Sequence, residues 1–275
     1  MQTPKPTPTS QDASSQHSNK ADASTKASSS AARAALSDSK VAVSWLHTAK
    51  FLTTAPTLQF LPRIEVPEIA FVGRSNVGKS SCINTLTQQQ RLAFASKTPG
   101  RTQAINLFSL GKHGVQDAVI ADLPGYGYAK VPLADKRRWQ NVMANYLVSR
   151  QSLVGIALLC DPRHGLTELD DMLLEIIRPR VEAGLKLLLI LTKADKLNRA
   201  ESTKALAIAK LQVAGADVRL FSSSKKTGVA EVSQLLWNWA HPDVAHSASS
   251  TTDSVAQSDA DFTSGPADEP EALDE

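Results

Sequence analysis

One eight-residue stretch limits what this chain can fold into more than any other. Residues 73–80 read Gly-Arg-Ser-Asn-Val-Gly-Lys-Ser, which fits the pattern G-x-x-x-x-G-K-[ST]. An apolar run at 68–72 precedes it and predicts a buried strand, and the residues from 81 to 86 suit the first turns of a helix. Strand, glycine-bounded loop and helix start form the context in which backbone N–H groups surround phosphate groups. The stretch therefore predicts a binding site for a nucleoside triphosphate.

Two side chains of this loop have expected chemical roles. Lys79 is expected to reach the β- and γ-phosphates, and the hydroxyl of Ser80 is expected to ligate Mg²⁺. The alternative is a chance glycine turn that carries a surface lysine. The strand and helix patterns on either side argue against that alternative.

Both ends of the chain differ in composition from the middle. Residues 1–40 are rich in Ser, Ala, Thr and Pro, and residues 246–275 contain eight acids and no Lys or Arg. Because neither end has enough apolar side chains to offset the entropy lost on folding, both are predicted to be disordered tails. Residues 41–245 are predicted to form one domain. They hold 25 basic and 16 acidic residues, which suits a polyanionic partner or simply a soluble basic surface.

The cysteines and the hydropathy pattern bear on the cellular compartment. Cys82 and Cys160 are far apart and show no paired spacing, so we expect them to be core residues of a protein from a reducing compartment. No apolar run approaches the length of about 18 residues that a membrane span needs. An organelle transit peptide is disfavoured but left open, since residues 1–40 carry three aspartates and one arginine. We expect a cytoplasmic monomer without a membrane partner.

The middle of the chain alternates between strand and helix patterns. Strands are predicted at 104–110 and 115–121, joined by a hairpin, and then at 153–160, 185–191 and 217–221. Helices are predicted at 134–150, at 199–213 and at 229–240. A further helix is predicted after the strand at 153–160 and ends at about residue 183. This order predicts an α/β fold with a mainly parallel central sheet, helices on both faces, and ligand loops at the carboxyl ends of the strands. Residues 41–67 are expected to be an approach segment packed through Trp45, Leu46, Phe51, Leu52 and Phe60.

Polar stretches at the ends of these strands indicate which nucleotide is bound. Asp122 could reach Mg²⁺ through water, and Gly125 could offer its N–H to the γ-phosphate. Asp195 could accept hydrogen bonds from both N1–H and the N2 amine of guanine, a pair that adenine lacks; a helix cap is the alternative. The stem of Lys193 could lie over the base plane, and the backbone of residues 221–223 could contact guanine O6. Thr102, in the loop after the first helix, could complete the Mg²⁺ sphere when a γ-phosphate is present.

Taken in order, these stretches resemble the translation-factor class of GTPases. Residues 73–81, 96–103, 122–129, 192–197 and 221–223 resemble the EngB (YihA/YsxC) ribosome-biogenesis GTPases, which belong to the TrmE-Era-EngA-EngB-septin-like group. The runs Pro-Gly-Arg-Thr-Gln and Pro-Gly-Tyr-Gly-Tyr are the most specific, and the resemblance covers about residues 44–240. It implies a P-loop GTPase fold, GTP and GDP as ligands, and a role in large ribosomal subunit assembly, cell division and septation. The implied partners are the large-subunit precursor and its rRNA.

The resemblance also implies which residues contact the nucleotide. They are Gly73, Arg74, Ser75, Asn76, Val77, Gly78, Lys79, Ser80, Gly100, Arg101, Thr102, Gln103, Ala104, Asp122, Leu123, Pro124, Gly125, Thr192, Lys193, Ala194, Asp195, Phe221, Ser222 and Ser223. Magnesium is expected on Ser80 and Thr102. The residues expected to take part in hydrolysis are Asn76, Lys79, Thr102, Asp122 and Gly125.

Three positions add detail to this comparison. Tyr126 stands where Ras-like enzymes carry the glutamine that orients water, so slow intrinsic hydrolysis is expected. Thr192 replaces the asparagine usual in GTPases, which is expected to weaken the bracing of the phosphate loop. Asn76 occupies the position where several related GTPases carry a potassium ligand; a purely local role in the loop turn is the alternative.

A basic cluster offers a possible RNA contact. Lys130, Lys136, Arg137 and Arg138 flank Trp139, a combination that suits RNA, although a solvated helix face with a buried tryptophan would look the same. Two other functions fit parts of the sequence. An rRNA-binding assembly factor with vestigial hydrolysis is disfavoured by the intact Lys79, Ser80, Thr102 and Asp122. An ATP-using kinase or ATPase is disfavoured by Asp195.

Overall fold

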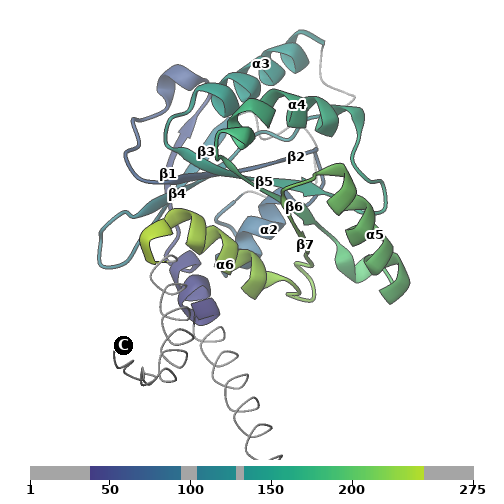
Figure 1. The fold of residues 1–275 in the computed structure, drawn as a ribbon. Coiled ribbons are helices and arrows are strands. Elements are labelled where there is room, and N and C mark those ends of the chain that lie inside the picture. Colours follow the sequence, from purple (N-terminus) through teal and green to yellow (C-terminus); the bar gives the residue numbers. More distant parts are fainter. Residues whose placement is uncertain (1–37, 94–103, 128–132, 245–275) are drawn as a thin grey trace, which may run out of the picture.

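The computed structural model describes residues 38–93, 104–127 and 133–244. Within the last range, only the backbone is described for residues 133–140. These residues form a seven-stranded sheet covered by helices on both faces (Figure 1). The strands are β1 (Lys50–Ala55), β2 (Glu68–Gly73), β3 (Ile105–Leu110), β4 (Ala118–Asp122), β5 (Leu153–Cys160), β6 (Lys186–Leu191) and β7 (Asp217–Leu220). The helices are α2 (Lys79–Leu86), α3 (Leu133–Ser149), α4 (Glu168–Glu182), α5 (Arg199–Gln212) and α6 (Val229–Ala240), and residues 38–46 are also helical.

The strand order is β1-β3-β4-β2-β5-β6-β7. Strand β2 pairs in parallel with β4 and β5, β5 with β6, and β6 with β7, whereas β3 is antiparallel to both β1 and β4. The prediction of a mainly parallel α/β sheet with one hairpin is therefore confirmed. All six residues of β2 are buried, as expected for a central strand with helices on both faces.

The alternation of side chains along the strands divides the core into two layers. One layer packs Cys82, Ile83 and Leu236 from α2 and α6 against Phe71 and Leu159. The other packs residues of α3, α4 and α5 against the opposite face of the same strands. Figure 1 shows α3 and α4 on one side of the sheet and α2 and α6 on the other. The parallel strands all point towards one edge, where the loops predicted to bind nucleotide follow β2, β4, β6 and β7.

The approach segment differs from its prediction. It contains an edge strand, β1, that pairs antiparallel with β3, and a short 3₁₀ turn at Leu58–Phe60. Trp45 and Leu46 are fully buried as predicted, but Phe51 is 59% exposed, Phe60 is 61% exposed and Leu52 is 37% exposed, so these three are wrong as packing anchors. Strand β1 lies at the sheet edge and has one hydrogen-bonded neighbour, an arrangement that its short, weakly apolar sequence does not predict. Among the described residues, no helix is long and apolar enough to cross a membrane.

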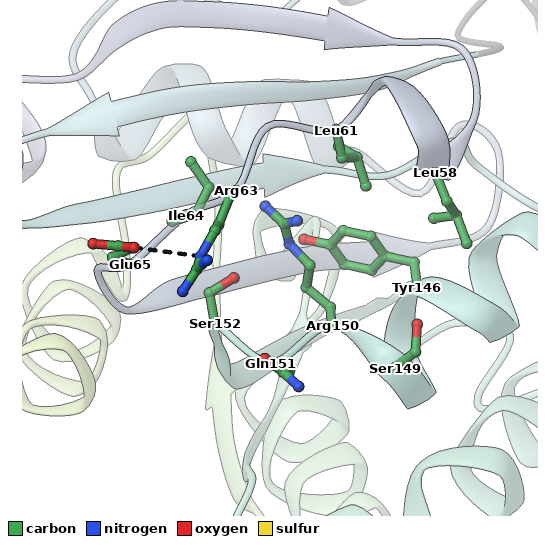
Figure 2. Close-up of a pocket in the computed structure, with 10 residues that line it drawn as sticks. All are labelled: Leu58, Leu61, Arg63, Ile64, Glu65, Tyr146, Ser149, Arg150, Gln151 and Ser152. Atoms are coloured by element: carbon green, nitrogen blue, oxygen red, sulfur yellow. Dashed lines mark ion pairs between the residues drawn. The ribbon is translucent and has the colours of Figure 1, made fainter.

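The start of β2 is held by a buried polar network at the end of the strand away from the phosphate loop. Glu68 is fully buried and accepts hydrogen bonds from the Tyr146 hydroxyl, the Arg150 guanidinium and the Ser152 hydroxyl. Burial of the phenol, followed by the Glu68 charge, holds the pKa of Tyr146 well above its ordinary value. Tyr146, Arg150 and Ser152 line an adjoining cavity, and Figure 2 shows these side chains. The cavity has a volume of about 580 Å³. The network fixes the strand that leads into the phosphate loop.

Candidate nucleotide-binding site

The loop between β2 and α2 has the backbone shape that a phosphate site requires. Asn76 and Gly78 have positive φ angles of 63° and 107°, so the chain curls back on itself before the helix. A Cβ atom on Gly73 would lie 2.8 Å from the carbonyl oxygen of Leu159, so only glycine fits beside β5. Helix α2 begins without a side-chain cap, which leaves its first N–H groups available to an anion.

Lys79 and Asp122 come together at the carboxyl ends of strands β2 and β4. Their side chains form a buried ion pair, with 7% of the Lys79 side chain and 1% of the Asp122 side chain exposed. The second carboxylate oxygen of Asp122, Oδ2, is buried and has no hydrogen-bond partner among the described residues. Such an orphaned anionic oxygen, on a carboxylate that pairs with the first residue of α2, fits a hydrated Mg²⁺ ion.

The segment after Asp122 lies directly on the phosphate loop. A Cβ atom on Gly125 would be 3.0 Å from the Cα atom of Ser75, so a larger residue would push the two segments apart. The N–H of Ser75 donates to the carbonyl of Tyr126 at 2.8 Å, and the N–H of Tyr126 lies 3.4 Å from the carbonyl of Gly73. Leu123 is fully buried, and its N–H donates to the carbonyl of Phe71. Residues 123–126 are thus positioned by backbone contacts with the strand and loop.

The side chain of Tyr126 is buried in the second core layer. Its hydroxyl donates to Oδ1 of Asp170, and the other Asp170 oxygen accepts hydrogen bonds from the N–H and hydroxyl of Thr167. Thr167 is the N-cap of α4, so the carboxylate joins the cap to the segment that follows Asp122. Burial, with the Asp170 charge and hydrogen bond adding to it, holds the pKa of the Tyr126 hydroxyl well above its ordinary value. Sequence reasoning missed Asp170, because its partner is far away in the sequence.

Thr192 and Lys193 brace the phosphate loop from the neighbouring strand. The Thr192 hydroxyl donates to the carbonyls of Val77 at 2.8 Å and of Cys160 at 3.1 Å, and Lys193 Nζ donates to the carbonyl of Asn76 at 3.0 Å. Thr192 therefore takes part in bracing the loop, and the expectation that it does so less firmly than an asparagine stays a prediction. Its hydroxyl, which is short and buried, reaches the loop directly.

Asp161 is a further residue of the site that sequence reasoning missed. It follows β5, is 8% exposed, and pairs with Lys193 at 3.1 Å and with Arg163 at 2.7 Å. Burial alone would raise the pKa of Asp161, but hydrogen bonds from Arg163 and Lys193 outweigh it and hold that pKa well below its ordinary value. The signal was its place directly after a buried parallel strand, the same place that Asp122 holds.

The two loops predicted to recognise the base also meet. The Ser222 hydroxyl donates to Oδ1 of Asp195 at 2.6 Å, and the Ala194 N–H donates to the carbonyl of Phe221 at 3.1 Å. The Ser222 hydrogen bond is the main cause that lowers the pKa of Asp195 below its ordinary value, so the carboxylate is ionised and acts as an acceptor. The Phe221 side chain is fully buried and supports both loops from inside the core.

Several predicted site residues lie outside the described part of the chain. These are Gly100, Arg101, Thr102 and Gln103, as well as Lys130; for Lys136, Arg137, Arg138 and Trp139 the backbone alone is described. Ala104 is described and directly precedes β3. The remaining predicted residues gather around one end of the sheet, which brings the phosphate loop, Asp122–Gly125, Thr192–Asp195 and Phe221–Ser223 into one site.

Comparison with known proteins agrees with this geometry. A family model described as "50S ribosome-binding GTPase" matches residues 68–193. The probable GTP-binding protein EngB of Albidiferax ferrireducens is 72% identical over 202 residues, covering 74% of this chain and 98% of that protein. The corresponding protein of Burkholderia ambifaria is 47% identical over 209 residues, covering 73% of this chain and 94% of that protein.

The fold is also found among solved structures. A crystal structure of a probable GTP-binding protein EngB has a TM-score of 0.50 and 18% identity, covering 64% of this chain and 99% of that one. A crystal structure of Aquifex aeolicus Era has a TM-score of 0.52 and 18% identity, covering 64% and 57%. The fold is that of P-loop GTPases, and the extent and level of identity to the curated relatives show that this chain belongs to the EngB family of GTP-binding proteins.

Proposed function

We propose that this protein hydrolyses GTP slowly and uses the GTP-bound state as a switch in assembly of the large ribosomal subunit, with a consequent role in cell division and septation. The observation that carries the proposal is the meeting, at one edge of the sheet, of a phosphate loop with Lys79 and Asp122 and a base loop with Asp195. The description of the matching family as 50S ribosome-binding supports the ribosomal partner.

Each side chain has a defined task in this proposal. The N–H groups at the start of α2 and the ammonium of Lys79 bind the phosphates, while Gly125 presents its N–H towards the γ-phosphate. The Lys79 ammonium exchanges its Asp122 partner for phosphate oxygens when nucleotide enters. The Ser80 hydroxyl and Thr102 would hold Mg²⁺, and the freed carboxylate of Asp122 would reach it through water; the ion would neutralise charge on the phosphate oxygens.

Slow intrinsic hydrolysis follows from the side chain after Gly125. The Tyr126 hydroxyl is engaged by Asp170, and 8% of the residue is exposed, so it is directed away from solvent. No amide stands at this position to orient an attacking water. A single-turnover measurement of phosphate release, with and without ribosomal particles, tests whether the isolated protein is slow and whether the particle accelerates it.

Guanine recognition is tested by Asp195→Asn. The ionised carboxylate accepts two guanine donors, whereas an amide pairs better with xanthine; losing such a buried pair discriminates by on the order of 10⁴-fold in favourable sites. We expect GDP affinity to fall and xanthosine diphosphate affinity to rise. Asp217→Asn is the matched control, since Asp217 lies on β7 and is 40% exposed. Unchanged GDP affinity in Asp195→Asn would remove this residue from the base pocket.

The switch and its ribosomal partner are tested by co-sedimentation with large-subunit precursors in a GTP analogue and in GDP. Association should depend on the γ-phosphate and fall steeply with salt, because basic side chains would displace counterions from rRNA. Thr102→Ala should retain GDP binding and lose the dependence on the γ-phosphate. An association that depends neither on salt concentration nor on the bound nucleotide would contradict the proposed switch.

The Asn76 side chain is proposed as a ligand of potassium, and the bound ion would supply positive charge beside the phosphates. Glycine accepts the positive φ of 63° at this position, so Asn76→Gly removes the side chain without straining the loop. Hydrolysis by the unaltered protein should be faster in potassium than in sodium at equal ionic strength, and Asn76→Gly should remove the difference while GTP binding persists. Equal rates in both salts would leave Asn76 with a role in the loop turn.

A further inference from the structure

A groove lies beside the edge strand β1, away from the residues assigned to the nucleotide. It encloses about 790 Å³ and is lined by Ala49, Lys50, Phe51, Gln89, Gln90, Arg91 and Leu92. One wall is the start of β1 and the other is the loop that follows the C-terminal end of α2. In Figure 1, β1 is found beside β3, at the edge of the sheet. The phosphates are expected at the opposite, N-terminal end of α2.

The walls of this groove are held in place by specific hydrogen bonds. The Asn84 side chain accepts from the N–H of Ala93 at 2.7 Å and donates to the carbonyl of Ala93 at 2.8 Å. The Gln89 side chain donates to the carbonyl of Ala49 at 2.6 Å, which joins the loop to the residue just before β1. Such contacts order the groove before any partner arrives, so binding loses less conformational entropy.

The groove presents an aromatic face, two cations and an exposed amide. Phe51 is 59% exposed although it makes an edge contact with Phe108, with ring centroids 6.3 Å apart. Lys50 and Arg91 are exposed, and the lining contains no acidic residue. Gln90 is exposed as well. An exposed phenylalanine in a groove whose lining carries two cations matches the needs of a nucleic acid strand with unstacked bases.

We infer that this groove binds an unpaired segment of RNA, with a base stacked on Phe51, phosphates on Lys50 and Arg91, and a base edge at Gln90. The inference rests on the proposed ribosomal partner and names the surface through which rRNA would be held. A peptide strand added to β1 is the rival occupant. It would pair with the backbone edge, where the register is interrupted by a bulge between Phe51 and Thr53, and would leave the two cations without partners.

The test measures binding of the full-length protein, loaded with a GTP analogue, to a fluorescent 12-nucleotide unstructured RNA. Stacking on one aromatic is worth about 1–3 kcal/mol, so Phe51→Ala should weaken binding by roughly 5- to 150-fold. Phe60→Ala is the matched control, since Phe60 is equally exposed and lies outside the lining of the groove. Lys50→Glu with Arg91→Glu should flatten the salt dependence, whereas Lys210→Glu on α5 should change it little.

The outcomes separate this inference from the proposed function. Retained GTP affinity with lost RNA binding in the groove variants would support the inference. RNA binding that survives the groove variants but is lost on charge reversal at Arg137 and Arg138 would overturn the inference and leave the rRNA partner intact. Particle association without any RNA binding, or cross-linking of β1 to a ribosomal protein, would also overturn it, because the surface would then be a protein interface. The urea midpoint of each variant checks that it is folded.

Discussion

The hydroxyl of Tyr126 donates a hydrogen bond to the carboxylate of Asp170, across 44 positions of sequence. Tyr126 follows the glycine that lies on the phosphate loop, and Asp170 completes the capping box of α4. The contact therefore joins the segment that lies on the phosphate loop to the start of a helix on the other side of the sheet from α2.

Replacing Tyr126 by Phe keeps the buried ring and removes this hydrogen bond. We expect a loss of about 1 kcal/mol of unfolding free energy, because Asp170 keeps its Thr167 partners. We also expect GTP affinity to fall more than GDP affinity, since the segment that presents Gly125 is less firmly held. Urea unfolding and nucleotide titration measure the two effects. Equal losses for both nucleotides would show that the contact is structural alone.

The bracing of the phosphate loop by Thr192 predicts a different pattern. Thr192→Val keeps the shape and removes the side-chain hydrogen bonds to the carbonyls of Val77 and Cys160. The Cys160 carbonyl keeps the N–H of residue 192 as a donor, so the main loss is at Val77. We expect GTP and GDP affinities to fall together by about tenfold, because the loop is positioned in both states. Thr203→Val, on the exposed surface of α5, is the matched control. A selective loss of GTP binding would contradict a simple bracing role.

The buried network at the start of β2 predicts a large effect on stability far from the nucleotide. Arg150→Ala leaves the fully buried Glu68 without its cation and should reduce the unfolding free energy by about 3 kcal/mol. Arg63→Ala is the control, since its ion pair with Glu65 is exposed and should contribute under about 0.5 kcal/mol. Similar losses in the two variants, measured by urea unfolding, would show that the network contributes little.

Asp161 predicts a dependence of stability on pH. Its pKa is depressed in the folded protein, so its stabilising contribution is present above the pKa of the unfolded chain, about 3.9, and is lost as pH falls through the folded value. Asp161→Asn should therefore destabilise the protein by about 1 kcal/mol at pH 7, a modest amount because Arg163 is 43% exposed. The difference from the unaltered protein should shrink below about pH 4. If the difference in unfolding free energy between the two proteins stayed the same from pH 7 to below about pH 4, the destabilisation would not come from the loss of the Asp161 charge.

The two cysteines give a simple check of the core. Both are buried and free, and burial raises the pKa of Cys160 to about 12. Because the thiolate is the reactive form, neither cysteine should react with iodoacetamide at pH 8 in the folded protein. Both should react at once in urea, and mass spectrometry of the peptides distinguishes them. Rapid labelling of Cys160 under native conditions would mean that the strand end opens readily.

The sequence alone determined the central architecture and most of the candidate site. A short apolar strand followed by the pattern at residues 73–80 has few physical solutions, because a backbone that surrounds phosphate needs glycine at Gly78 and a helix directly after it. The polar residues predicted after β2, β4, β6 and β7 lie close together, since parallel strands end on the same side of a sheet, whereas Asp161 after β5 was missed. The roles of the individual residues, the RNA and potassium contacts and the tails stay predictions.

Tertiary structure alone decided the contacts between residues that are distant in sequence. Edge strand β1 forms because β3 offers it a row of backbone partners, and this leaves Phe51 exposed where apolarity had predicted burial. Asp170 and Asp161 carry no local pattern that reveals the Tyr126 hydroxyl or the Lys193 ammonium as their partners. Hydrophobic periodicity reports which face of an element is buried, whereas a hydrogen bond depends on two groups meeting after the fold has closed.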